Sequence, residues 1–259
     1  MSHDHHDHGA DSSGVPWEGR AFQDNPHAGD NGETAPDVAE RLNSWRAGTG
    51  SFTDLVAALA TSRFLIPLVA HAGDDFDADH PVMEDKVQEL SVVTVAGPNG
   101  EKVIPVFTSV AAMSAWNSDA RPIPIDAQRV ALAAASEQTD RVVVNPGTDS
   151  IVIRRPALWT IAQGTTYLAP WESTEFVAET RSLLDGIDDL VEVGVGPGDR
   201  AASGEGPDVV VFLGLPDGLD ADAVRAVVTE AHARIASNES FIHRVDALAL
   251  TIGKITASS

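Results

Sequence analysis

The segment "VIPVFTSVAAMSAW", residues 103–116, combines three local signals. An apolar run is followed by Thr108 and Ser109, and an alanine-rich segment then ends at Trp116. A hydroxyl between a strand and an amphipathic segment can accept a hydrogen bond from the unpaired amides of a helix's first turn. The pattern therefore predicts a strand, a cap at Thr108 or Ser109, and then a helix. The buried face of that helix is expected to carry Val110, Met113 and Trp116.

The same two hydroxyls also raise the question of a catalytic nucleophile. A nucleophilic serine of the strand–turn–helix type sits in a strained G-x-S-x-G turn. That pattern does not occur anywhere in the 259 residues. Helix capping explains both hydroxyls without a further assumption, so we interpret the pair as the start of a helix.

Strand and helix signals continue on both sides of this segment. Residues 90–107 hold two apolar runs around Gly97–Gly100, and residues 141–153 hold two more around Asn145-Pro146-Gly147, so each stretch predicts a β-hairpin. "RFLIPLV", residues 63–69, predicts a strand at an edge or a bend, because Pro67 has no backbone donor. Helical periodicity or capping marks residues 37–48, 51–62, 126–138 and 155–164.

A second group of elements follows residue 168. A helix over residues 173–186 precedes strands at 189–195 and 208–214, a helix capped by Asp220, and a last strand at 247–252. The chain therefore predicts an α+β fold with mixed or antiparallel sheets covered by helices, in two α+β units. We divide it into a His- and Asp-rich arm (1–36), a first domain (37–168) and a smaller second domain (169–259).

Several ordered landmarks resemble a known family. "IPVFTSVAAMSAW", then "RPIPI" and "VVVNPGT", are similar to the N-terminal domain of the SseB family, named for enhanced serine sensitivity. The preceding "EDKVQELSVVTVAGPNGEKV" looks like the actinobacterial branch. The resemblance covers about residues 52–165, while residues 173–255 match the C-terminal domain of longer members in pattern only. It implies no catalytic set, because none is established for the family.

Charge and composition narrow the classes of partner. The net charge of −22 disfavours direct nucleic-acid binding and anionic membranes, because both rely on Lys and Arg. No apolar run reaches the roughly 18–20 residues that span a bilayer. Without cysteine the chain has no disulfide, zinc–thiolate site or Cys nucleophile. We expect a cytoplasmic protein whose partners are proteins with basic or apolar surfaces.

Two segments could bind metal ions. The arm carries His3, His5, His6 and His8 between aspartates, and neutral imidazoles can bind zinc, nickel or copper. Such binding on an open chain would be adventitious, and a polar leader explains the same residues.

The acidic loop at residues 74–85 is the second candidate. It begins like a calcium loop, with Asp75, Asp77 and Asp79 at alternate positions. His80 then stands where the turn glycine belongs, and Lys86 replaces the closing glutamate, which favours a solvated acidic loop.

A glycine-rich segment, "GVGPGDRAASGEGP" at residues 194–207, invites a nucleotide-binding interpretation. It lacks the lysine and hydroxyl of a P-loop and leads into a strand, so a mobile inter-strand loop is the better prediction. The sequence thus favours a non-enzymatic cytoplasmic protein that binds another protein, with no cofactor and with self-assembly left open. The alternatives are a metal-dependent hydrolase using residues 74–85 and metal buffering by the His arm.

Overall fold

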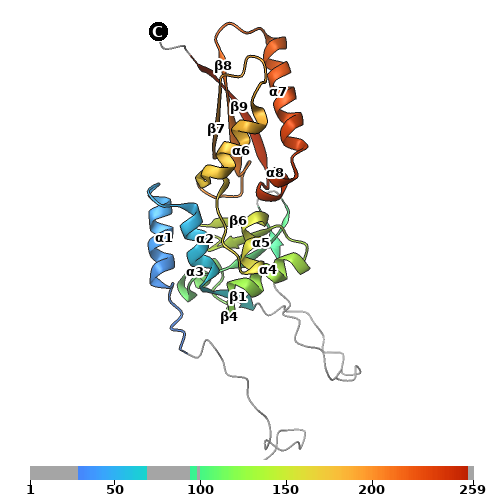
Figure 1. The fold of residues 1–259 in the computed structure, drawn as a ribbon. Coiled ribbons are helices and arrows are strands. Elements are labelled where there is room, and N and C mark those ends of the chain that lie inside the picture. The colour runs from blue at the N-terminus through green and yellow to red at the C-terminus, as the bar shows by residue number, and fades with distance from the viewer. Residues whose placement is uncertain (1–28, 69–93, 98–99, 256–259) are drawn as a thin grey trace, which may run out of the picture. The chain divides into compact units, whose positions relative to one another are not determined.

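A computed structural model describes residues 29–68, 94–97 and 100–255 (Figure 1). Residues from Gly32 onward form one compact unit, and every helix and strand of the described residues lies within it. The predicted division near residue 168 stays a prediction. The predicted His-rich arm and the acidic loop at 74–85 lie outside the described residues.

The described residues alternate between helices and strands. The helices are α1 (Pro36–Arg46), α2 (Phe52–Ala60), α3 (Val110–Trp116), α4 (Ala127–Ser136), α5 (Arg155–Gln163), the 3-10 turn η1 (Pro170–Glu172), α6 (Thr174–Leu184), α7 (Ala221–Ala236) and α8 (Glu239–Arg244). The strands are β1 (Arg63–Leu68), β2 (Val95–Ala96), β3 (Lys102–Val106), β4 (Arg121–Asp126), β5 (Arg141–Val144), β6 (Ile151–Arg154), β7 (Glu192–Pro197), β8 (Val209–Pro216) and β9 (Leu248–Ile255). Their sheets are mixed or antiparallel, so the predicted α+β class is confirmed.

The four-stranded sheet has the order β2-β3-β5-β6. Strand β3 runs parallel to β5, and the other two pairings are antiparallel. Both predicted hairpins are therefore confirmed where the chain is described. The second turns at Asn145, whose φ of 52° lies in the left-handed region that asparagine tolerates.

A two-stranded antiparallel sheet pairs β1 with β4, a strand that sequence reasoning did not predict. Pro122 and Pro124 argued against a strand, because proline has no ladder donor. The register resolves this conflict. The backbone of Leu65 exchanges hydrogen bonds with Phe107, so Pro124, which lies opposite Leu65, does not need to donate. Pro67, predicted at an edge or a bend, lies opposite Pro122 in this two-stranded sheet.

The predicted helix caps are present. Ser109 Oγ accepts a hydrogen bond from Ala112 N at 3.1 Å, and Asp220 caps α7. Met113 is fully buried on the inner face of α3, with Trp116 partly buried beside it. Val110 was predicted on the same face, but it is 37% exposed. Val110 is the first residue of α3, and its backbone amide donates to the carbonyl of Gly32.

The three-stranded sheet has the order β7-β8-β9, with β8 antiparallel to β7 and parallel to β9. One face of β8 is fully buried, and Figure 1 shows α6 and α7 beside these strands. Its apolar cluster joins β8 to Phe176 and Leu184 of α6 and to Val227, Ala231 and Ile235 of α7. A larger cluster lies among α1, α2, α4, α5 and strands β1 and β3–β6, and Trp171 packs against both clusters. Helix α8 was not predicted.

Candidate functional site: a buried polar junction

The metal predictions cannot be placed on the structure. His3, His5, His6, His8 and the loop at 74–85 lie outside the described residues. Within residues 29–68, 94–97 and 100–255, no three His, Asp or Glu side chains are grouped so that they could hold a metal ion. Both metal sites stay predictions.

The Thr108–Ser109 pair belongs to the backbone scaffold. Thr108 is buried, and its backbone N–H donates to Asn145 Oδ1 at 2.9 Å. Asn145 Nδ2 in turn donates to the Thr108 hydroxyl at 3.0 Å. The Asn145 amide thereby ties the β3–α3 connection to the β5–β6 turn. Each hydroxyl has a structural partner, as the capping interpretation predicted for Ser109.

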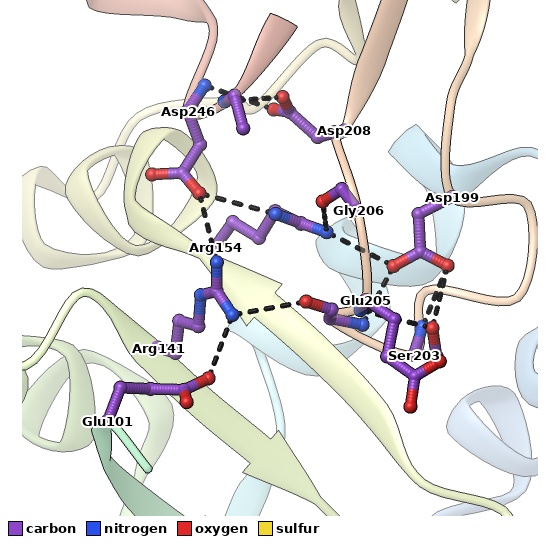
Figure 2. Close-up of polar contacts among 11 residues, drawn as sticks. Glu101, Arg141, Arg154, Asp199, Ser203, Glu205, Gly206, Asp208 and Asp246 are labelled. Carbon is purple, nitrogen blue, oxygen red and sulfur yellow. Dashed lines mark hydrogen bonds and ion pairs between the residues drawn. The ribbon is translucent and has the colours of Figure 1, made fainter. Parts of the chain in front are cut away.

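The largest group of buried charges lies elsewhere, around Arg154 at the end of β6 (Figure 2). The Arg154 side chain is only 8% exposed. Its guanidinium donates to Asp199 at 3.1 Å, to Asp246 at 3.4 Å and to the Gly206 carbonyl at 2.9 Å. We call this group the polar junction; its members are Glu101, Arg141, Arg154, Asp199, Gly204, Gly206, Asp208 and Asp246.

The β5–β6 ladder explains why the junction needs so many carboxylates. The register sets Arg141 directly opposite Arg154, and like charges facing each other across a sheet are destabilising. Arg141 donates to Glu101 at 2.8 Å, and its guanidinium lies 4.0 Å from Asp246. Because Asp246 contacts both arginines, it offsets their repulsion.

The glycine-rich loop between β7 and β8 closes the junction, and Figure 2 shows Asp199 pointing toward Arg154. Asp199 also accepts hydrogen bonds from the Ser203 amide and hydroxyl at 3.0 Å each, and from Gly204 N at 2.7 Å. The loop also pairs with β6, since Ala202 O accepts from Val152 N at 2.7 Å. The loop does lie between strands, as predicted, but these contacts hold it in place, which the prediction of a mobile loop did not anticipate.

Gly204 shows that the loop sequence is fitted to this position. Its φ of +84° is left-handed, and a Cβ there would lie 2.8 Å from Val152 Cγ2. Its carbonyl accepts a hydrogen bond from Arg141 at 3.1 Å. Glycine is thus required by both backbone conformation and space.

Asp208 fixes the start of β9. Its carboxylate accepts hydrogen bonds from Ala247 N at 2.8 Å and Asp246 N at 3.1 Å. Burial raises the pKa of Asp208, and these two amides and the nearby Arg154 only partly offset the increase. Asp208 therefore holds backbone in place at a desolvation cost for its charge.

A small cavity adjoins the junction. It measures about 20 Å³, room for one or two water molecules, and its lining includes Arg154, Asp208 and Tyr167. Burial, together with the charges of Asp208 and Glu172, raises the pKa of the Tyr167 hydroxyl above its ordinary value. The hydroxyl therefore stays protonated at neutral pH. The cavity is too small for a drug-sized ligand, which needs about 300 Å³ or more.

A second carboxylate, Glu172 in η1, serves a helix end. It accepts hydrogen bonds from the Ser51 hydroxyl at 2.7 Å, Phe52 N at 2.8 Å and Thr53 N at 3.1 Å, which places it at the N-terminus of α2. Burial would raise the pKa of Glu172, but these hydrogen bonds outweigh it and lower the pKa. Glu172 and Asp208 thus both bind backbone amides, with opposite shifts in pKa.

Sequence reasoning missed the junction. The available signal was "IVIRRP" at residues 151–156, where two arginines end an otherwise apolar strand. A buried arginine requires a carboxylate partner. The partners, however, lie 45 and 92 residues away in the sequence, so no local pattern could identify them.

These observations define the chain as an α+β protein in which buried ion pairs and hydrogen bonds connect segments that are far apart in the sequence. Residues 38–160 match the family model described as SseB protein N-terminal domain. This segment is therefore an SseB N-terminal domain, and the sequence resemblance is confirmed. The actinobacterial assignment stays a prediction.

Comparisons with curated proteins and with solved structures returned no match. Among the described residues, no helix combines the length and the apolar character needed to cross a membrane.

Proposed function

We propose that this chain is a non-enzymatic cytoplasmic protein that acts by binding another protein. One observation carries the proposal: the charged side chains of the polar junction form ion pairs and hydrogen bonds within the protein itself. Arg154 is shared among two carboxylates and a carbonyl, and Asp199 and Asp208 each bind backbone amides. A general acid or base needs an accessible group aimed at a reacting atom.

An exposed apolar surface on the SseB domain supports the same proposal. Trp159 of α5 is 60% exposed, and Leu132 of α4 is 53% exposed. Gln128, in the first turn of α4, donates to the carbonyl of Ala162, near the end of α5, so the two helices that carry these residues are in contact. Tryptophan is enriched among the residues that dominate protein–protein binding energy.

The surface also indicates what kind of partner fits. The chain carries a net charge of −22, which speeds encounter with basic proteins. We therefore expect a partner that presents an apolar patch to Trp159 and Leu132 within a basic surround.

The experiment uses the full chain as bait. Proteins cross-linked to it in native lysate are identified, produced in purified form and titrated calorimetrically. The proposal predicts saturable binding that weakens at least tenfold in Trp159→Ala, because a buried tryptophan contact is worth about 2 kcal/mol or more. Leu168→Ala, which alters another exposed apolar residue (52% exposed), is the matched control. If no purified candidate binds saturably, the proposal fails.

The hydrolase alternative needs a separate measurement, because its residues 74–85 lie outside the described part of the chain. Protein prepared without a metal-affinity column is dialysed and analysed for metal. Stoichiometric metal that disappears in Asp77→Ala, accompanied by turnover, would favour the hydrolase. Metal that disappears only when residues 3–8 are removed would favour buffering by His3, His5, His6 and His8.

A further inference from the structure

The two edge strands of the C-terminal sheet, β7 and β9, differ in the contacts of their outward-facing backbone groups. On the β7 edge, Arg181 Nε donates to the Val193 carbonyl at 3.1 Å, and Pro197 has no amide proton to offer. Strand β9 forms the other edge and, within the described residues, is hydrogen-bonded to β8 alone. An unprotected edge strand of eight residues is a template for pairing with another strand.

The register shows which β9 residues face outward. Ala247 O accepts hydrogen bonds from Asp208 N and Val209 N, so its backbone faces β8. Backbone groups alternate between the two edges along a strand. The amides and carbonyls of Leu248, Leu250, Ile252 and Lys254 therefore point to the open edge.

The side chains of these residues continue the core row of β8. Leu250 lies beside Val211 and Ile252 beside Leu213, both of which are fully buried. Leu250 is only partly buried, however, and Ile252 is 44% exposed. A strand added at this edge would bring further side chains against Leu250 and Ile252 and would extend the apolar cluster that α7 and β8 form.

The charge of β9 contrasts with that of the whole chain. The protein carries 39 acidic residues, yet the strand "LALTIGKI" has none and carries one positive charge at Lys254. Lys254 is largely exposed, 3.7 Å from Asp217. The strand is thus apolar in its centre and carries its single charge near its end.

We propose that two copies of this chain associate by antiparallel pairing of their β9 edges about a two-fold axis at Thr251. This register sets Leu250 opposite Ile252 of the second copy, and Thr251 opposite itself. Lys254 falls opposite Leu248 of the second copy, against which its aliphatic stem can pack. The centre of the pairing is therefore apolar on both sides.

A second copy fits this edge because Leu250 and Ile252 meet each other when the strand is reversed against itself. Two-fold pairing also closes the assembly, since each copy contributes the same β9 edge and neither copy keeps an unpaired one. The resulting six-stranded sheet would have β7, whose edge Arg181 contacts, at each end.

The absence of cysteine makes the register directly testable. The backbone of Thr251 faces β8, so Thr251 and its symmetry mate form a non-hydrogen-bonded pair, with Cα atoms about 4.5 Å apart. That spacing suits a disulfide. Thr251→Cys should therefore cross-link into a dimer under mild oxidation. Ala249→Cys is the matched control on the same face, because its mate lies four residues away along the paired strands and should not cross-link.

The oligomeric state of the full chain is measured by sedimentation over a range of protein concentrations. We expect wild type to reach twice the 27.2 kDa mass of one chain. Ile252→Lys should weaken dimerisation at least 100-fold, because it places two lysines near the axis. Ile242→Lys, at a residue 49% exposed on α8, should dimerise like wild type. Circular dichroism of each variant establishes that it remains folded.

Three results would overturn the proposal. They are a wild type that stays monomeric at every concentration, an Ile252→Lys variant that dimerises like wild type, and cross-linking of Ala249→Cys in place of Thr251→Cys. Neither the dimer nor its loss bears on the proposed function, which is tested by Trp159→Ala.

Discussion

The polar junction around Arg154 and the open edge of β9 differ in whether their polar groups have partners within the protein. At the junction, buried side-chain charges contact one another and the backbone of the β7–β8 loop. At the edge, four residues direct their amides and carbonyls away from β8, beside partly exposed apolar side chains. Asp246 lies close to both regions, since it contacts Arg154 and lies two residues before the start of β9.

The difference shows where binding capacity is to be expected. A buried charge whose partners are all internal cannot contact a ligand without losing one of them. A strand edge with free backbone groups gains hydrogen bonds when it binds. In this protein the most conspicuous charged cluster of the described residues therefore stabilises the fold, while the regions suited to association are apolar.

The largest effect is expected at the junction. Arg154→Met should lower the free energy of unfolding by about 3–5 kcal/mol, because it leaves Asp199 buried without its cation and removes the cation nearest to Asp246. Arg225→Ala is the matched control, since its ion pair with Asp222 is on the surface, with Arg225 71% exposed. It should cost less than about 1 kcal/mol. Urea denaturation measures both, and equal losses would contradict a structural junction.

Glu172→Gln should have the next largest effect, about 1 kcal/mol, because it removes the charge that caps α2. Since folding lowers the pKa of Glu172, its contribution is complete above the ordinary carboxyl range and is lost as pH falls through the folded pKa. Denaturation curves of wild type and variant should therefore differ most at neutral pH and converge in acid. A difference that grows in acid would contradict this sign.

Asp208→Asn should change the pH dependence in the opposite direction. Folding raises the pKa of Asp208, so its contribution to stability is greatest below the ordinary pKa and declines as pH rises through the folded pKa. The variant lacks this decline, and its stability relative to wild type should increase from acid to neutral pH. We expect a change below about 1 kcal/mol, because the lost amide contacts offset the relief of desolvation. The opposite slope would show that the carboxylate is stabilised by the junction.

The smallest effect on stability is expected at the edge. Ile252→Lys should alter the unfolding free energy of the monomer by no more than about 0.5 kcal/mol, since the residue is 44% exposed. Urea denaturation at low protein concentration, where wild type is dissociated, provides the measurement. A loss comparable to that of Arg154→Met would mean that Ile252 belongs to the core and that the edge is not available for pairing.

The sequence predicted features that depend on neighbouring residues. Caps at Ser109 and Asp220 and the turn at Asn145 rely on contacts within a few positions, and all are present. Strand β4 was missed because Pro124 has no amide to donate. Its partner Leu65 exchanges backbone hydrogen bonds with Phe107, which is distant in sequence, so no donor is needed from Pro124.

The junction could not be predicted for a related reason. Its ion pairs join β6 to a loop 45 residues further on and to the start of β9. The sequence shows that a strand ends in two arginines, but the choice of carboxylates among 39 acidic residues depends on the fold. The open edge likewise becomes visible only once β9 is known to be the last strand of its sheet.

The central claim, that the junction charges stabilise the fold through one another, is tested most directly by a double-mutant cycle on Arg154 and Asp199. Urea denaturation gives the unfolding free energies of wild type, Arg154→Met, Asp199→Asn and the double variant. We predict a coupling energy of about 1–3 kcal/mol, so that the second substitution costs much less than it does alone. Additive losses, with a coupling near zero, would contradict the claim.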